Sequence, residues 1–203
     1  MRILLATTNP AKKQRYTRVL SAIAEEVVGL SDAGIYEMPV ESGESAEENA
    51  ELKARFYAAK GGIVAFAEDE ALYVDFLPEE AQPGVNVRRV NGSEEVDDSR
   101  LLEYWQNVVS ATAEHKRTGK WHIAYCLATP RGSVALVSQE HPIRFFSPPS
   151  QVRIPGWPMS SVQGPAALAR PRSELSGEEL RAIDDAVDGL LLDELRQALT
   201  VLL

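Results

Sequence analysis

The first 24 residues constrain the fold of this chain more than any other segment. Residues 2–6 (RILLA) form an apolar run that predicts a buried strand, and the polar turn Thr7-Thr8-Asn9-Pro10 follows at once. Residues 11–24 then carry apolar side chains at helical spacing, namely Tyr16, Val19, Leu20 and Ile23. Because strand, polar turn and amphipathic helix in this order are typical of an α/β sheet, we predict an α/β fold.

A second helix and a second buried strand follow. The spacing predicts a helix over 45–60, with Ser45 as N-cap, Glu48 completing a capping box, and Gly61-Gly62 ending it. Residues 63–67 predict a buried strand that ends in the acidic run 68–70. The remaining predictions are a strand at 71–77, a loop at 78–96, a helix at 97–113, a hairpin of 121–128 with 133–138, irregular chain over 142–172, and one or two helices over 176–202 starting at Ser176.

Composition limits the class of protein. With 203 residues, 44% of them hydrophobic, the chain suits a single domain spanning residues 1–203 with a sizeable core. A net charge of −9 repels polyanions, which argues against nucleic acid or an anionic membrane as partner. The N-terminal apolar run is short and interrupted, unlike a signal peptide, and no segment approaches the roughly 20 apolar residues of a membrane span. Cys126 is the single cysteine, which fits a reducing compartment, so we expect a cytoplasmic protein.

The turn after the first strand has the groups that an anion needs. Thr7, Thr8, Asn9 and Lys12 supply hydroxyls, an amide and an ammonium at the start of a helix, where backbone N–H groups and the helix dipole favour negative charge. The same residues also fit an ordinary capped helix start with solvated lysines. Spacing alone does not decide between the two interpretations.

Acidic residues form a second group of candidates. Glu68 and Asp69 follow a buried strand, where ligands of open α/β sheets bind, and adjacent carboxylates there suit Mg²⁺. Glu41, which precedes the second helix, is the best further ligand. The alternative is a solvated acidic turn, which the acidic run taken alone favours. In the loop, Arg88 and Arg89 suit either a phosphate clamp or ordinary surface charge.

Four motifs, in order, resemble the inosine triphosphate pyrophosphatase family. LLATTNPAKK is similar to its phosphate loop T-x-N-x-x-K, and ESGESAEENAELKA to E-T-G-x-T-F-x-E-N-A-x-x-K-A. AEDEALYVDFL resembles D-D-S-G-L-x-V-D-x-L, and QPGVNVRRVNG resembles P-G-V-x-S-A-R-x-x-G. The resemblance covers residues 3–92, and 117–128 more loosely.

The resemblance implies a fold and a reaction. The fold would be an elongated mixed sheet flanked by helices, in two lobes with a central cleft, and the protein commonly a homodimer. The reaction would be Mg²⁺-dependent hydrolysis of a nucleoside triphosphate to the monophosphate and pyrophosphate. The metal ligands would be Glu41 and Asp69. The catalytic residues would be Asp69, Glu68 and Lys53, and the substrate-binding residues Thr7, Thr8, Asn9, Lys12, Arg89 and Trp157.

The C-terminal half departs from the family pattern. PGWPMSS at 155–161 keeps Gly156 and Trp157 of G-F-G-Y-D-P but loses its Asp, and Leu180 stands where the family has Lys. Residues 184–186 (Asp-Asp-Ala) replace Ser-His-Arg, which in the family holds the base, and Arg15 stands where Glu is usual. We therefore expect an altered base preference. The alternatives are an inactive relative that binds a nucleotide or partner, and an enzyme acting on another phosphorylated metabolite.

Overall fold

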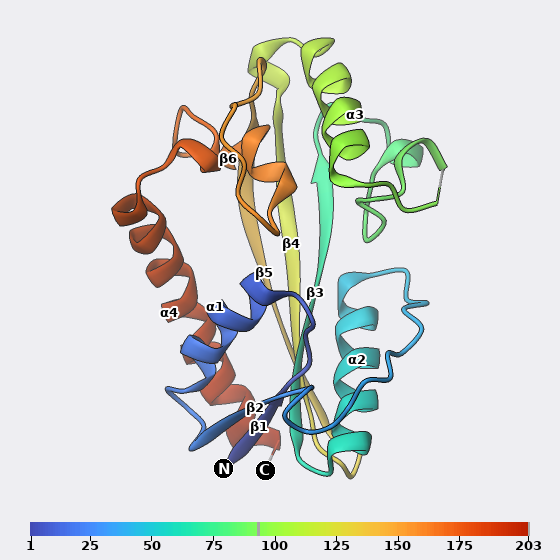
Figure 1. The fold of residues 1–203 in the computed structure, drawn as a ribbon, viewed down its shortest axis with the longest axis vertical. Coiled ribbons are helices and arrows are strands. Elements are labelled where there is room, and N and C mark those ends of the chain that lie inside the picture. The colour runs from blue at the N-terminus through green and yellow to red at the C-terminus, as the bar shows by residue number, and fades with distance from the viewer. Residues whose placement is uncertain (93, 203) are drawn as a thin grey trace. The chain divides into compact units, whose positions relative to one another are not determined.

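The computed structural model describes residues 1–92 and 94–202, apart from the side chain of Asn91. Its six-stranded sheet has the order β2-β1-β3-β4-β5-β6 (Figure 1). The strands are β1 (Arg2–Leu5), β2 (Glu26–Gly29), β3 (Val64–Val74), β4 (Thr118–Ala128), β5 (Val134–Phe145) and β6 (Gln163–Pro165). The α-helices are α1 (Pro10–Leu20), α2 (Ala46–Gly61), α3 (Asp98–Ser110) and α4 (Gly177–Leu202).

The sheet is mixed. β1 pairs in parallel with β2 and with β3, whereas β5 and β6 pair antiparallel. Parallel strands need a crossover connection, and here α1 connects β1 to β2 and α2 connects β2 to β3. The predicted α/β class and mixed sheet are therefore confirmed.

The acidic run lies inside a strand. We expected strands at 63–67 and 71–77 with the acids between them, but β3 is continuous from Val64 to Val74, so that prediction is wrong. A strand tolerates charged residues where each finds a partner, as these do. The parallel pairing of β3 with β1 nevertheless ends at Phe66, opposite Leu5. The acids thus still follow the carboxyl end of the parallel pair.

Helix boundaries follow local capping. Ser45 accepts a hydrogen bond from the N–H of Glu48, and Gly62 ends α2 in the left-handed conformation, at φ 66°. Ser176 and Glu179 form a reciprocal capping box at the start of α4, which is one helix and not two. Two expectations need correction: β2 was not predicted, and the supposedly irregular 142–172 contains the end of β5 and β6.

The described residues group into two compact units. Unit 1 comprises residues 1–70, 123–139 and the chain from 184 onward, and unit 2 comprises 71–122 and 140–183. In unit 1, Tyr16 of α1 packs on Phe66 and Tyr125, with ring centroids 5.3 and 6.0 Å apart. This aromatic contact seats α1 on β3, directly before the acidic run.

The core of unit 2 surrounds α3. Four apolar residues of this helix are buried, namely Leu101, Leu102, Trp105 and Val109. The indole of Trp105 stacks on Phe145 at 5.3 Å between ring centroids.

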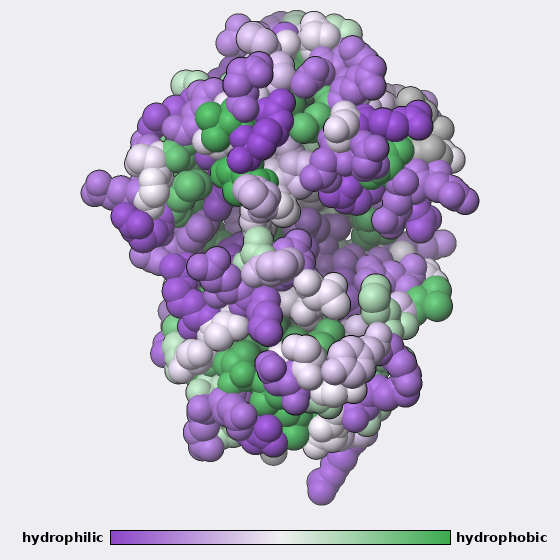
Figure 2. Space-filling view, viewed as in Figure 1, coloured by the Kyte–Doolittle hydropathy of each residue, from purple (hydrophilic) through white to green (hydrophobic). Residues whose placement is uncertain are grey.

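On the face shown in Figure 2, hydrophilic residues dominate, with smaller hydrophobic areas among them. Among the helices described, none has the length and apolar character needed to cross a bilayer.

Candidate functional site

The turn after β1 is a capped helix start. The side chain of Asn9 accepts hydrogen bonds from the N–H groups of Ala11 and Lys12, at 2.9 and 3.4 Å, and Pro10 has no N–H. The next N–H, that of Lys13, already bonds to the Asn9 carbonyl at 2.8 Å. An anion at this turn would therefore bind through side chains and the helix dipole, unless Asn9 released the backbone. The predicted backbone cradle is thus occupied by the protein itself.

Side chains at this turn lie where a ligand can reach some of them. Thr7 accepts a hydrogen bond from the N–H of Asn9 at 3.2 Å, and Thr8 is exposed. Lys12 is mostly buried, and its ammonium lies 2.9 Å from Glu68 and 3.4 Å from Glu70. Lys12 is therefore held over the acidic run of β3.

A second lysine holds the other acids. Lys53 of α2 lies 2.6 Å from the carboxylate of Asp69 and 3.6 Å from that of Glu41. Glu41 comes from the segment before α2, and Asp69 from the middle of β3. Residues distant in sequence thus converge on one ammonium group.

The segment carrying Glu41 is fixed by α2. Asn49 is buried and accepts a hydrogen bond from the N–H of Gly43 at 2.8 Å, and Glu48 accepts one from the N–H of Glu44 at 2.7 Å. The capping box thus reaches one residue before the N-cap Ser45. A Cβ at Gly43 would lie 2.7 Å from the side chains of Asn49 and Glu48, so the tight approach requires glycine here.

Strand alternation separates the acids into two groups. Successive side chains of a strand point to opposite faces of the sheet. Accordingly, Glu68 and Glu70 pair with Lys12 of α1, while Asp69 pairs with Lys53 of α2. Over residues 1–92 and 94–202 no three His, Cys, Asp or Glu side chains are placed to share a metal ion. Glu68 thus contacts Lys12, whereas Glu41 and Asp69 share Lys53.

Burial and charge shift the pKa values of the site. Burial raises the pKa of Glu68, and Glu70 adds to this rise while Lys12 opposes it. Burial also raises the pKa of Asp69, against the pull of Lys53 and the hydrogen bond from Asn49. For Lys12, burial alone would lower the pKa, but the carboxylates of Glu70 and Glu68 outweigh it and raise it. Carboxylates with raised pKa values are better proton acceptors than ordinary ones.

Two predicted substrate-binding residues belong to unit 2. Arg89 is exposed in the loop before α3, and Trp157 is half-buried at the start of a short 3₁₀ helix, Pro158–Ser161. The neighbour of Arg89 supports the loop, because Arg88 pairs with Asp98 at 2.5 Å and donates to the carbonyl of Val96. The two arginines therefore do not act as a pair.

Sequence reasoning left two residues out of the predicted site. Glu70 contacts Lys12. The sequence feature that could have identified Glu70 is an acidic residue at a position where the family pattern has Ser. Asn49 fastens the Glu41 segment and also hydrogen-bonds Asp69. The sequence feature that could have identified Asn49 is the E-N-A segment of the second motif.

A family comparison agrees with these motifs. The family model described as "Ham1 family" matches residues 3–142, more than half of the chain. The chain belongs to the Ham1 family. The family resemblance read from the sequence is thereby confirmed.

Curated relatives of this Ham1 chain include two bacterial proteins named dITP/XTP pyrophosphatase. That of Zymomonas mobilis is 35% identical over 133 residues, 66% of this chain and 62% of the relative. That of Exiguobacterium is 35% identical over 140 residues, 68% of this chain and 67% of the relative. The chain thus spans about two thirds of the length of the curated relatives it matches.

Solved Ham1-like structures share the fold. The nucleoside-triphosphatase / dITP/XTP pyrophosphatase of Mycobacterium abscessus superposes with a TM-score of 0.73 at 29% identity, covering 94% of this chain and 96% of that chain. A HAM1 protein of Coxiella burnetii gives a TM-score of 0.76 at 21% identity, covering 98% of each chain, and this likeness concerns the fold alone. The predicted fold class is thus confirmed a second time.

The departure in α4 has a structural counterpart. Where the family pattern has Ser-His-Arg, Asp185 of this Ham1 chain pairs with Arg18 of α1 at 3.4 Å. Asp188, one turn on, is buried and binds Arg15 at 2.8 Å and Arg18 at 2.6 Å. This part of α4 therefore holds α1 through carboxylates.

Proposed function

We propose that this Ham1 chain hydrolyses a nucleoside triphosphate to the monophosphate and pyrophosphate with Mg²⁺ as cofactor. The observation that carries the proposal is the arrangement on β3. Lys12 pairs with Glu68, and Lys53 pairs with the next residue of the strand, Asp69, beside the turn that starts α1. One end of this arrangement suits phosphates, and the other suits a cation. The names of the relatives from Zymomonas and Exiguobacterium support the same reaction.

The acids fit Mg²⁺. Glu41 and Asp69 already converge on one positive charge, the ammonium of Lys53. Mg²⁺ is often held by one or two carboxylates, with substrate phosphates and water as its other ligands. Glu41 and Asp69 would hold the ion, and when bound it would neutralise phosphate charge and orient water.

Asp69 is the better-placed general base. The carboxylate of Glu68 is almost fully buried, and both its oxygens lie within 3.1 Å of the Lys12 ammonium. Asp69 is less buried, and its hydrogen bonds to Lys53 and Asn49 favour the ionised form. Asp69 would accept the proton of a water that attacks the α-phosphorus, while the bond from that phosphorus to the bridging oxygen breaks and pyrophosphate leaves.

The phosphate tail would lie at the turn after β1. Thr7, Thr8 and Asn9 offer hydroxyls and an amide, the helix dipole favours the anion, and Lys12 supplies a positive charge. Carboxylates at 184 and 185 replace the family's base-holding groups, so the base preference would differ from that of the family. The homodimer, the cytoplasmic location and the substrate roles of Arg89 and Trp157 stay expectations of the family resemblance.

A nucleotide panel tests the proposal. Inosine, xanthosine and the four standard nucleoside triphosphates, as ribo and deoxy forms, are incubated with the chain and Mg²⁺, and pyrophosphate is measured. We expect release with at least one triphosphate and loss of release with a chelator. Absence of release from every triphosphate would overturn the proposal and favour a nucleotide-binding relative without activity.

The variant Asp69→Asn tests the assigned base. We expect turnover to fall by about 10²-fold or more, because the amide cannot accept the proton, while the circular dichroism spectrum shows that the variant remains folded. Asp193→Asn is the matched control, since this carboxylate is exposed on α4 and removes the same charge. Turnover near that of the wild type in Asp69→Asn would remove this residue from the mechanism.

A further inference from the structure

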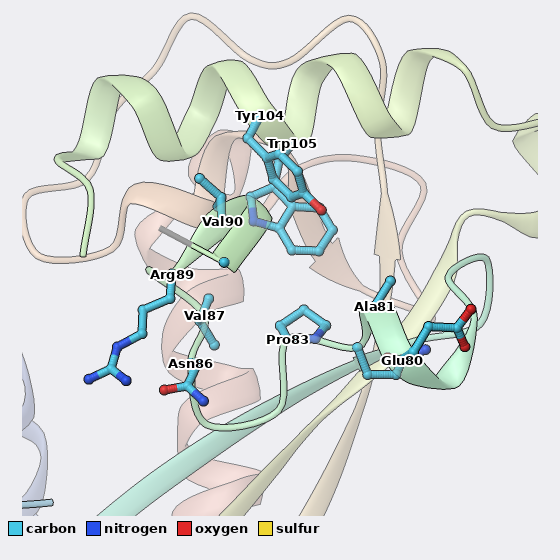
Figure 3. A pocket seen from close by; sticks show the side chains of 11 residues that line it. Glu80, Ala81, Pro83, Asn86, Val87, Arg89, Val90, Tyr104 and Trp105 are labelled. Atoms are coloured by element: carbon cyan, nitrogen blue, oxygen red, sulfur yellow. The ribbon is translucent and has the colours of Figure 1, made fainter. Parts of the chain in front are cut away.

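Unit 2 contains a pocket of its own. It has a volume of about 530 Å³ and lies between α3 and the loop of residues 79–92 (Figure 3). Tyr104 and Trp105 form the wall on the helix side, and Pro83, Val87 and Val90 line the loop side. The volume is within the range of small-molecule sites, and such sites combine apolar walls with a few polar groups.

The loop wall is fixed to β3. Leu72 and Gly84 exchange backbone hydrogen bonds of 2.9 and 3.1 Å, and Gly84 has φ 52°, which favours glycine. The side-chain amide of Gln82 bonds to both backbone groups of Val74, at 2.8 Å, and to the carbonyl of Leu77 at 2.7 Å. Since hydrogen bonds to several separate backbone groups hold the loop, the loop wall of the pocket has a fixed position against β3.

One wall contains a buried donor that the protein leaves unused. The indole nitrogen of Trp105 is buried and has no hydrogen-bond partner in the described part of the chain. Figure 3 shows this nitrogen on the side of the ring that faces Val90. A buried N–H without a partner costs free energy, and a ligand acceptor would recover it.

A cation stands at the mouth of the pocket. Arg89 lines the pocket and extends its guanidinium outward from the loop, next to Asn86 (Figure 3). Within residues 1–92 and 94–202 its guanidinium makes no hydrogen bond or ion pair, unlike Arg88, which Asp98 and the carbonyl of Val96 hold. An anionic group of a ligand would find a charge-assisted donor there.

We propose that this pocket binds a small molecule with a flat ring that carries a hydrogen-bond acceptor and an anionic substituent, as a nucleoside monophosphate does. The ring would lie between Tyr104 and the valines of the loop, with its acceptor toward Trp105 and its anionic group at Arg89. The choice of a nucleoside monophosphate as probe rests on the proposed function, of which it is a product. The pocket itself stands on unit 2 alone.

Calorimetric titration with inosine monophosphate tests the pocket. The full chain is titrated without Mg²⁺ or triphosphate. We expect binding, about tenfold weaker in Arg89→Gln, which removes the charge partner, and also weaker in Trp105→Phe, which removes the indole donor but keeps a ring. Arg100→Gln is the matched control, because it removes the same charge from an exposed position in the first turn of α3. Inorganic phosphate alone should bind too weakly to measure, because the ring supplies most of the contact.

Three outcomes would overturn the proposal: no binding by the wild type, wild-type affinity in Arg89→Gln, or wild-type affinity in a folded Trp105→Phe. Lys12→Gln tests whether the monophosphate binds instead at the turn after β1. If this variant loses affinity while Arg89→Gln keeps it, the monophosphate sits at the turn after β1 and the pocket proposal fails. If Trp105→Phe does not fold, Arg89→Gln and Lys12→Gln decide together: the pocket requires weaker binding in Arg89→Gln and unchanged binding in Lys12→Gln. Because the titration needs no turnover, lack of pyrophosphate release in the nucleotide panel leaves this result unaffected.

Discussion

Lys12 has two carboxylate partners where the family pattern offers one. Glu68 lies 2.9 Å from its ammonium, and Glu70, at the Ser position of the family pattern, lies 3.4 Å away. If phosphates bind at Lys12 as proposed, Glu70 would compete with the incoming phosphate for this ammonium and would also repel it. We therefore expect Glu70→Gln to lower the KM for the triphosphate about threefold, in keeping with a partly exposed ion pair, with kcat little changed. Initial rates of pyrophosphate release over a range of triphosphate concentrations measure both constants.

A charge-matched variant separates the local effect of Glu70 from that of net charge. Glu51 pairs with Arg55 on the surface of α2, with an exposed fraction of 33% against 30% for Glu70. Glu51→Gln should leave KM unchanged. An unchanged or higher KM in Glu70→Gln would show that Glu70 does not restrain Lys12.

At the scale of elements, the buried carboxylate of Asp188 connects α4 to α1. Asp188 of α4 accepts hydrogen bonds from Arg15 at 2.8 Å and from Arg18 at 2.6 Å, and its side chain is 9% exposed. Removing one partner of a buried ion pair leaves charge uncompensated. We expect Asp188→Ala to lower the free energy of unfolding by about 3 kcal/mol, measured by urea denaturation.

The control for Asp188 lies one turn earlier. Asp185 contacts the same Arg18, at 3.4 Å, but its side chain is 67% exposed. Asp185→Ala should change stability by no more than about 0.5 kcal/mol, as exposed pairs do. Equal losses in the two variants would mean that burial is not what gives Asp188 its effect.

The start of α4 should respond to pH. The backbone N–H and hydroxyl of Ser176, and then Arg170, lower the pKa of Glu179 from its ordinary 4.5. A lowered pKa in the folded state means that the ionised carboxylate stabilises the fold above pH 4.5, and that this contribution disappears as the pH falls through the lowered value. Glu179→Gln should therefore be less stable than the wild type at pH 7, with the difference shrinking below pH 4.5 in thermal unfolding. A difference that does not depend on pH would assign the effect to hydrogen-bond geometry instead of charge.

Local capping was readable from the sequence, whereas pairing across the sheet was not. Ser45, Gly62 and Ser176 act within a few residues, so their roles followed from spacing. The family motifs assigned Glu41, Lys53 and Asp69 to one predicted site, and in the structure the two carboxylates both contact the Lys53 ammonium. The continuity of β3 was missed, since its charged middle is stabilised by lysines from two other elements.

The same limit explains the division of the acids. Alternation along a strand separates Glu68 from Asp69, but this argument applies only once the run is known to be a strand. The strand β2 was missed for a related reason: it is short, and its first residue is an exposed Glu paired with Arg2 of β1. Such an edge strand is defined by its neighbour more than by its own composition.

At the scale of the whole molecule, the two compact units share their secondary structure. The chain passes between them four times, at 70–71, 122–123, 139–140 and 183–184. These positions lie within β3, β4, β5 and α4 respectively, and none lies in a loop. Independent domains are joined by exposed linkers that few contacts cross. We therefore expect the chain to behave as the single domain that its length predicted.

Two natural probes test this expectation, one in each unit. The three tryptophans, Trp105, Trp121 and Trp157, belong to unit 2, and the single cysteine, Cys126, belongs to unit 1. Cys126 is buried, which raises the pKa of its thiol to about 12, so a thiol reagent at about pH 8 should modify it only when unit 1 opens. In urea, the midpoint of the tryptophan fluorescence change and the midpoint of pulsed Cys126 labelling should coincide, because every crossing element would have to break for one unit to unfold alone. Labelling that reaches completion at urea concentrations where the fluorescence is still native would show that unit 1 unfolds separately, and the chain would then be two domains.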